Sequence, residues 1–370
     1  MDRGDVGRSA GSRPMVVRVP VEPVEAAAEA DAADANARAG DVVVRGPVFG
    51  VAVQGAGDEP RWRVVSAVTD GCPQQARDGL NSLLWFRAKD DAYDRAERRA
   101  LLAAVARLES ERVDEIAVAG SRYRIVRAEE YAVTGPDGIE GPRPTDPEPP
   151  VPDWSHGKTG PDVDDDLVLD PDAPVTPAQA IEQLALRGLS YSGGRFPKDV
   201  RSESQRALDS HPDVFLLPPS FTIVERSAGG WTPVNGPHVS AHAARKALDF
   251  SLTWMWPRMR GLIPYDADMH ADARTLAAAG AAFAGPAAAE LAEYAAAADT
   301  VRAGSRVNRL EFQGSAYEIA RTRRLVRWGP DGPEGPRPSD VNTQDPTRLH
   351  PPLDEDGRVL PDSCAPEGGG

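Results

Sequence analysis

The chain has 370 residues, enough for about two domains of average size, and its formal net charge is −15. This acidic balance argues against generic binding to nucleic-acid phosphates, which requires clustered cations. Its 34 glycines and 35 prolines exceed average usage, so we expect folded domains joined by irregular segments. Cys72 and Cys364 are too far apart in sequence for a disulfide framework or a zinc motif, as is typical of a reduced, cytoplasmic protein.

In chain order, the hydrophobic pattern predicts a strand at residues 15–21, a helix at 21–37 and two apolar strands at 42–53 and 62–68. Two helices at 76–86 and 91–112 follow, and a hairpin around Gly120 at 116–126 closes the series. A similar order follows. A strand at residues 166–169 precedes two helices at 176–189 and 197–211, apolar strands at 214–224, a helix at 244–254 and a hairpin around Gly314 at 310–320. The fold class is therefore α+β, with short antiparallel strands and helices packed on one face.

The two series resemble each other in sequence as well as in order. Residues 111–146 align with residues 305–340 without gaps, and 17 of 36 positions are identical. Upstream, residues 76–86 match residues 244–254 at a shorter offset, which places about 25 extra residues near positions 259–283. We interpret this similarity as an internal duplication that gave two related domains, or two halves of one pseudo-symmetric domain.

The predicted organisation has five segments. A disordered N-terminus and a first repeat are followed by a Pro-rich acidic linker, a second repeat and a disordered tail, at residues 1–14, 15–146, 147–164, 165–340 and 341–370. The N-terminus lacks the apolar stretch of a secretory signal, and the Ala-rich stretch at residues 276–289 is interrupted by glycine and proline, so no membrane span is expected.

The most distinctive motif is GPDGIEGPRPTD at residues 135–146, which recurs as GPDGPEGPRPSD at residues 329–340 with 10 of 12 positions identical. We call these the first clasp and the second clasp. Pro-Asp-Gly predicts a tight turn, and Glu140 with Arg143 is spaced for a local ion pair, as is Glu334 with Arg337. The favoured interpretation is a rigid clasp over the helices of its own or the other copy. The alternative presents Arg143 and Arg337 to a carboxylate or phosphate group.

Two arginines lie in phase with the buried face of the hairpin strands. Counting by twos places Arg127 with Tyr123 and Ile125, and Arg321 occupies the same place in the second repeat. Each is expected to pair with a nearby acid, while the alternative is an anion site. The candidate ligand-binding residues are therefore Arg127, Arg143, Arg321 and Arg337, and an anionic ligand between the halves requires all four to converge on one pocket. The cationic run at residues 321–327 is expected to form an exposed strand edge.

Metal and catalytic motifs are incomplete. His238 and His242 lack the glutamate of a zinc-protease helix, and the alternating acids and histidine at positions 266–272 have no fixed geometry. Asp162, Asp164 and Asp166 begin like a calcium loop, but position six is not glycine, so we expect a solvated acidic linker. No nucleophile elbow, Walker loop or dinucleotide fingerprint is present. We expect no metal and no cofactor, and no catalytic residue is assigned.

The clasp motif, the RGPVFGVA strand and the ERVDEIAVAGSRYRIVRAEEY hairpin resemble an uncharacterised actinomycete family typical of Streptomyces, whose members carry a domain of unknown function. The resemblance covers most of residues 15–342 and implies an intracellular protein with two related halves. It implies no activity, cofactor or catalytic residue.

The sequence leaves the activity unknown and favours a non-catalytic cytoplasmic interaction or structural protein, with a protein partner and no membrane or nucleic acid. The alternative is a binder of a small anionic ligand, or an enzyme acting on one, at the arginines between the halves.

Overall fold

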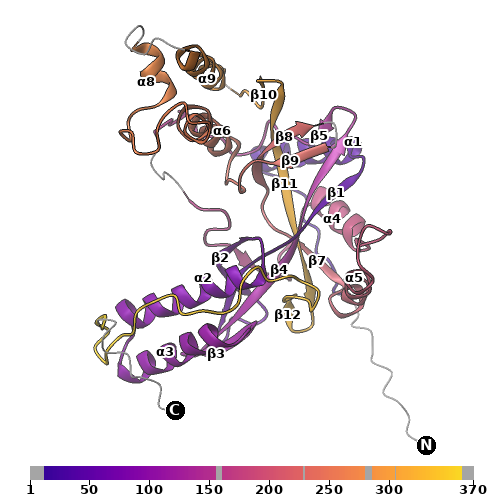
Figure 1. Cartoon of the computed structure of the whole chain (residues 1–370). Coiled ribbons are helices and arrows are strands. Elements are labelled where there is room, and N and C mark those ends of the chain that lie inside the picture. The colour runs from indigo at the N-terminus through magenta and orange to yellow at the C-terminus, as the bar shows by residue number, and fades with distance from the viewer. Residues whose placement is uncertain (1–11, 156–160, 228–229, 280–285, 305, 361–370) are drawn as a thin grey trace, which may run out of the picture.

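The computed structural model describes residues 12–155, 161–227, 230–279, 286–304 and 306–360. Its centre consists of two long antiparallel strands, β4 (Ser121–Gly135) and β11 (Ser315–Gly329), which cross the middle of the molecule (Figure 1). They pair from Ala128 opposite Val326 to Ala132 opposite Thr322. The two predicted hairpins therefore share one continuous sheet.

The strands beside β4 and β11 extend the sheet on both sides. On one side lie β1 (Val42–Gly55), β2 (Trp62–Asp70) and β6 (Val168–Leu169), and β3 (Glu115–Val118) forms the hairpin with β4. On the other side lie β7 (Asp213–Leu216), β8 (Ser220–Ser227) and β9 (Gly230–Pro233), and β10 (Arg309–Phe312) forms the hairpin with β11. This antiparallel sheet with its helices confirms the α+β class.

The hairpin turns have the geometry that the glycines predict. Ala119 and Gly120 have φ values of 50° and 72°, and Gln313 and Gly314 have values of 48° and 83°. Two consecutive residues with positive φ suit the right-handed twist of a two-residue hairpin.

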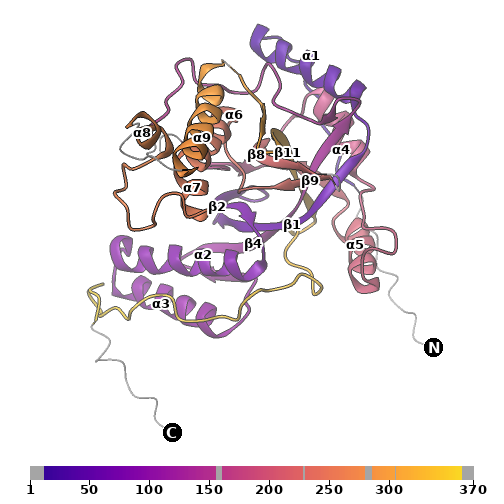
Figure 2. The same cartoon turned by 45° about the horizontal axis from the view of Figure 1, so that its top comes forward.

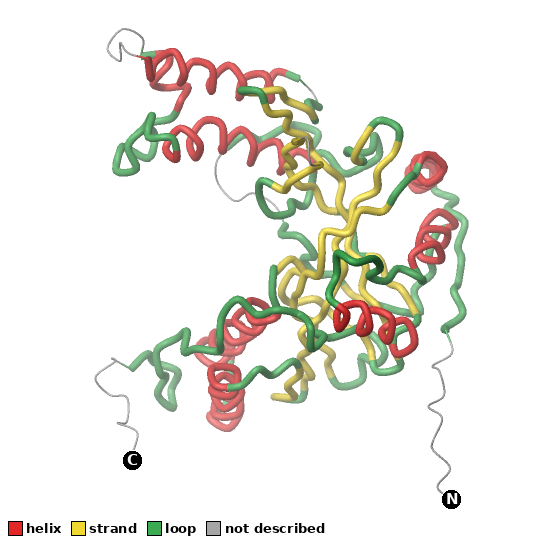
Figure 3. The backbone as a smooth tube through the Cα atoms, turned by 45° about the vertical axis from the view of Figure 1, so that its right-hand side comes forward, coloured by secondary structure: helices red, strands yellow, loops and turns green. Residues whose placement is uncertain are grey.

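Two pairs of helices pack against the outer parts of the sheet (Figure 3). In the first half, α2 (Pro73–Phe86) and α3 (Arg95–Ser110) cover Phe49 and Ile125, and the predicted stripe on α3 is buried, with Leu101, Ala104, Val105 and Leu108. In the second half, α6 (Ala241–Phe250) and α9 (Pro286–Ala303) cover Phe221 and Ile319. The short helix α7 (Trp256–Met259) precedes the extra residues, which form a loop and α8 (Ala273–Ala278), while residues 280–285 lie outside the described part.

Short π-helical segments continue the first helix of each pair. The segment η1 (Arg87–Asp91) follows α2 directly, and η2 (Ser251–Met255) follows α6.

Three further helices lie on the right-hand side of Figure 2, apart from the two helix pairs. These are α1 (Pro23–Arg38), α4 (Pro177–Leu186) and α5 (Lys198–Ser210), close to their predicted bounds. Thr176 and Gln179 form a capping box that starts α4. The strand predicted at residues 15–21 is wrong, because this segment makes only an isolated bridge between Val17 and Val175.

Residues 194 positions apart occupy corresponding places in the sheet. Arg127 lies opposite Phe49 on β1, and Arg321 lies opposite Phe221 on β8. At the centre, Glu130 lies opposite Arg324, and these two residues are themselves 194 positions apart. The pairing of β4 with β11 is therefore symmetric about this residue pair.

The segment after the second clasp differs from the expected disordered tail over the part that is described. Residues 341–360 run along α2 and α3, as the yellow segment in Figure 2 shows. The ring of His350 stacks on Trp85 with centroids 4.6 Å apart, and Arg95 binds Glu355 at 2.9 Å. Stacking and ion pairs to distant helices hold this polar segment, and composition does not reveal such contacts. Residues 361–370 and 1–11 lie outside the described part.

Candidate functional site

Each clasp begins with the tight turn that its sequence predicts. Strand β5 (Gly138–Ile139) pairs with the end of β4, and β12 (Gly332–Pro333) pairs with the end of β11. The predicted local ion pairs are confirmed, because Arg143 Nε donates to Glu140 Oε1 at 2.7 Å. Arg337 Nε donates to Glu334 Oε1 at the same 2.7 Å.

After the turn, each clasp crosses to the opposite half. The backbone N–H of Arg321 donates to the carbonyl of Glu140 at 2.8 Å, and the N–H of Arg127 donates to the carbonyl of Glu334 at 2.9 Å. The segments after the clasps continue in the same direction. Arg245 on α6 binds Glu148 at 2.6 Å, while Arg77 on α2 binds Asn342 at 3.1 Å. Each clasp therefore fastens the half to which it does not belong.

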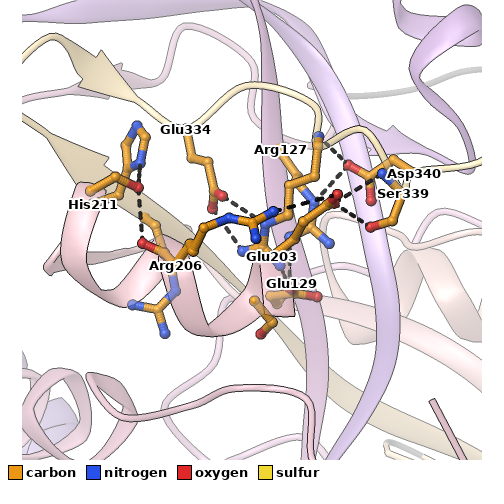
Figure 4. Close-up of polar contacts among 12 residues, drawn as sticks. Arg127, Glu129, Glu203, Arg206, His211, Glu334, Ser339 and Asp340 are labelled. Carbon is orange, nitrogen blue, oxygen red and sulfur yellow. Dashed lines mark hydrogen bonds and ion pairs between the residues drawn. The ribbon is translucent and has the colours of Figure 1, made fainter. Parts of the chain in front are cut away.

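The Arg127 network joins the first half's strand to the second clasp (Figure 4). Arg127 donates through Nε to Asp340 at 2.9 Å and through Nη1 to Glu129 at 2.6 Å. Tyr191 also donates to Glu129 at 2.6 Å, and Arg337 reaches the same carboxylate at 3.4 Å. Burial alone would raise the pKa of the Glu129 carboxyl. The Arg127 charge and the hydrogen bonds from Tyr191 and Arg127 together lower the pKa by more than this, so it lies below its ordinary value.

The Arg321 network is the corresponding arrangement around the first clasp. Arg321 Nε lies 3.1 Å from both oxygens of Asp146, and its Nη1 lies 3.9 Å from Glu140. Its neighbour Arg323 binds Glu140 at 2.6 Å and also pairs with Glu182 of α4. Burial lowers the pKa of Arg321, and the neighbouring Arg323 adds to this effect.

The four predicted arginines thus fall into two separate pairs. Arg127 lies with Arg337, and Arg321 lies with Arg143, each pair being closed by carboxylates. Three of the four are buried, and Arg143 is half-buried. The convergence of all four on one pocket, which the anionic-ligand hypothesis requires, is not observed.

A further arginine, Arg324, lies on the opposite face of the sheet centre. It binds both oxygens of Asp164, with Nη2 at 2.9 Å from Oδ1, and both side chains are buried. Two predictions were therefore wrong. The cationic run at residues 321–327 lies on a central strand instead of an exposed edge, and Asp164 is buried instead of solvated. The reason is similar in both cases: Asp164 and Arg324 neutralise each other, and Arg321 and Arg323 of the run also pair with carboxylates from distant segments.

The last residues of each clasp attach it to a helix that precedes the sheet of its own half. The backbone N–H of Thr145 donates to Asp31 of α1 at 3.2 Å, and that of Ser339 donates to Glu203 of α5 at 2.9 Å. The hydroxyl groups of both residues donate to the same carboxylates. The sequence shows this signal only as the Thr/Ser-Asp ending that both copies of the motif share, and the acids on the helices follow no recognisable pattern.

A pocket of about 450 Å³ lies beside the Arg127 network. Arg45 and Arg127 line it together with Glu130, Tyr191 and Phe196. Arg45 binds Glu130 at 2.7 Å, so the cations of this pocket already have anionic partners.

The other predicted chemistry is structural in the described residues. His242 lies 2.9 Å from the carbonyl of Asp153, His238 contacts Asn235, and Asp272 caps α8. Within the described ranges, no group of three or more His, Cys, Asp and Glu side chains is placed to hold a metal ion. None of the helices in these ranges combines the length and apolar character needed to cross a membrane.

Comparison with known proteins identifies the family. The family described as "Family of unknown function (DUF5954)" matches residues 22–343, which include both clasps and the whole sheet. No curated protein and no solved structure matches the chain. The chain belongs to the DUF5954 family of unknown function.

Proposed function

We propose that the protein is a non-catalytic interaction or structural protein whose two halves are fastened to each other by the clasps. One observation carries this proposal: the two strand arginines that stand out in the sequence are buried and bond to carboxylates from distant segments. Arg127 bonds to Asp340, 213 positions away, and Arg321 bonds to Asp146, 175 positions away. Removing one partner of such a buried pair is strongly destabilising, and the paired groups have little capacity left for a substrate.

The proposal includes three finer statements. The halves arose by duplication, which the matching places of Arg127 and Arg321 support. The protein is cytoplasmic, which the unpaired thiol of Cys72 supports. Its origin is an actinomycete, which the resemblance of the clasp motif supports.

The test has two parts that use the full chain. We expect tagged protein, purified from its native cells and analysed by native mass spectrometry, to retain a protein partner at fixed stoichiometry. We also expect no turnover when the protein is incubated with a metabolite extract and followed by mass spectrometry. A product that forms with the wild type but not with Arg127→Ala, while both give the same circular dichroism spectrum, contradicts the proposal.

A second candidate function is the binding of a small anion at the 450 Å³ pocket, because Arg45 and Arg127 both line it. Titration with acetate and with inorganic phosphate tests this candidate. Saturable binding that is lost in Arg45→Ala supports it, and binding unchanged by that substitution contradicts it.

A further inference from the structure

A different pocket, of about 330 Å³, lies between α4 and β7 in the second half. The N-terminal segment closes one side, because Val175 donates to the carbonyl of Val16 at 2.9 Å and Arg18 donates to that of Val175 at 2.8 Å. The walls are largely apolar and include Met15, Val16, Val175, Phe215, Leu216 and Trp328. An apolar cavity of this size with a few polar groups is the usual form of a small-molecule site.

The first polar group in this pocket is the amide of Gln183. Gln183 lines the pocket from α4, and only 8% of it is exposed. Its side chain makes no hydrogen bond with any residue that the structure describes. The amide atoms are not fully enclosed by protein, so they remain free to bond to a partner in the cavity.

The second polar group is the guanidinium of Arg187, one helical turn after Gln183 and therefore on the same side of that segment. Its Nε is buried without a hydrogen-bond partner in the described residues, and its Nη2 reaches Asp213 at a long 3.4 Å. Because Nε is enclosed by protein, the guanidinium can reach the cavity only through its terminal nitrogens, and of these Nη2 is weakly occupied. It adds an N–H donor to the wall that holds Gln183.

Charges of both signs line the pocket. Arg13 pairs with Asp172 at 3.0 Å, Arg187 pairs with Asp213, and the third carboxylate, Asp170, accepts from the backbone N–H of Asp172. An anionic ligand would meet three carboxylates, and a cationic ligand would meet two guanidiniums, so no charged ligand finds only opposite charge. This mixture favours an uncharged ligand.

We propose that this pocket binds a small, uncharged, largely apolar molecule that carries a carbonyl or carboxamide group. The oxygen of the ligand accepts from the Gln183 amide and the Arg187 guanidinium, and its apolar body packs against Phe215 and Trp328. This site is independent of the proposed interaction function, because it uses neither clasp nor any residue of the Arg127 and Arg321 networks.

The test is a titration of the full chain with benzamide, benzoate and toluene, followed by ligand-observed NMR. We expect benzamide to saturate with a dissociation constant of about 1 mM, as its size permits. We expect benzoate and toluene to bind at least about tenfold more weakly, because benzoate carries a negative charge and toluene has no polar group. Binding by benzoate as tight as that of benzamide, or no saturable binding of benzamide, overturns the proposal.

Substitutions locate the binding. Gln183→Leu and Gln183→Glu are each expected to weaken benzamide binding about tenfold or more, the loss that one unsatisfied hydrogen bond produces. Ile181→Ala, which alters a residue on the exposed side of the same helix, is the matched control and is expected to leave binding unchanged. Thermal denaturation identifies any variant that fails to fold. If one Gln183 variant does not fold, benzamide binding by the other is compared with binding by the wild type. Benzamide binding that is unchanged in a folded Gln183 variant overturns the proposal.

Discussion

The Arg127 and Arg321 networks are built on corresponding positions but are completed differently. In the Arg127 network, the strand itself supplies the acid Glu129 two residues later. In the Arg321 network, the corresponding position is Arg323, and its charge is met by Glu140 and by Glu182 from α4. Helices α1 and α5 each precede the long strands of their half, so α4 is an additional element. The comparison teaches that a second arginine on the strand is tolerated because an added helix brings an acid to it.

The centre of the sheet shows the same divergence. Glu130 and Arg324 face each other, although like residues at these positions would put like charges side by side. Each turns to a different partner, Arg45 for Glu130 and Asp164 for Arg324. The two halves therefore complement each other in charge where they meet.

The largest effect is expected at Asp164, because its pair with Arg324 is fully buried, whereas Arg45, the partner of Glu130, is exposed. Asp164→Ala leaves the Arg324 guanidinium buried without its carboxylate, so we expect the free energy of unfolding to fall by about 3–5 kcal/mol. Urea denaturation of the full chain measures the change. Asp165→Ala, at an exposed neighbour, is the control and is expected to stay within about 0.5 kcal/mol of the wild type.

The two strand arginines, Arg127 and Arg321, are expected to differ in the same assay. Arg127→Ala leaves both Glu129 and Asp340 without their main cation, and we expect a loss of about 3 kcal/mol. Arg321→Ala leaves chiefly Asp146, because Glu140 keeps Arg143 and Arg323, and we expect about 2 kcal/mol. Equal losses, or a larger loss for Arg321→Ala, would show that the extra acid from α4 does not distinguish the networks.

The clasp turns provide a smaller contrast. Gly138 and Gly332 both have a φ of 111°, a conformation that strains any other residue. A Cβ at Gly332 would lie 2.7 Å from Nε1 of Trp62, whereas at Gly138 the nearest atom, in Trp231, is 3.4 Å away. We expect Gly332→Ala to destabilise the protein by about 1 kcal/mol more than Gly138→Ala, measured as the difference between urea midpoints at equal m.

The smallest expected effect concerns pH. Burial, with a contribution from Asp78, raises the pKa of Asp70 to about 6. The folded protein then holds a proton that the unfolded chain has lost, so this group's stabilising contribution is present at pH 4 and is lost as the pH rises to 6. We expect Asp70→Asn to increase stability at pH 7 by about 1 kcal/mol, after allowance for solvent screening, and to have little effect at pH 4.

His238 lies opposite Phe221, as Asp70 lies opposite Phe49, and it provides the opposite dependence. Burial lowers the pKa of His238 from 6.5, so the unfolded chain binds the proton first and stability is lost as the pH falls below 6.5. His238→Gln is expected to reduce this loss of stability at acid pH. Urea denaturation between pH 4 and 8 checks both variants, and parallel pH profiles for variant and wild type would contradict the assignment.

Local chemistry made much of this fold predictable. Glycines at the hairpin and clasp turns, the stripe on α3 and the Thr176 cap all act within a few residues of their position. The arginines of β11 were misread because their acids lie in other segments, such as Asp164, which is 160 positions from Arg324. The sequence predicted that Arg127 and Arg321 are buried and paired, but local pairing patterns carry no information about which clasp reaches which half.

Hydrogen exchange tests the reciprocal fastening most directly. In Asp340→Ala, the altered residue belongs to the second clasp, but its main cation is Arg127 in the first half. We expect exchange under native conditions to accelerate in β4 and α2 of the first half, with Asp146→Ala giving the mirror result in β11 and α6. Faster exchange confined to the half that carries each substitution would contradict the account.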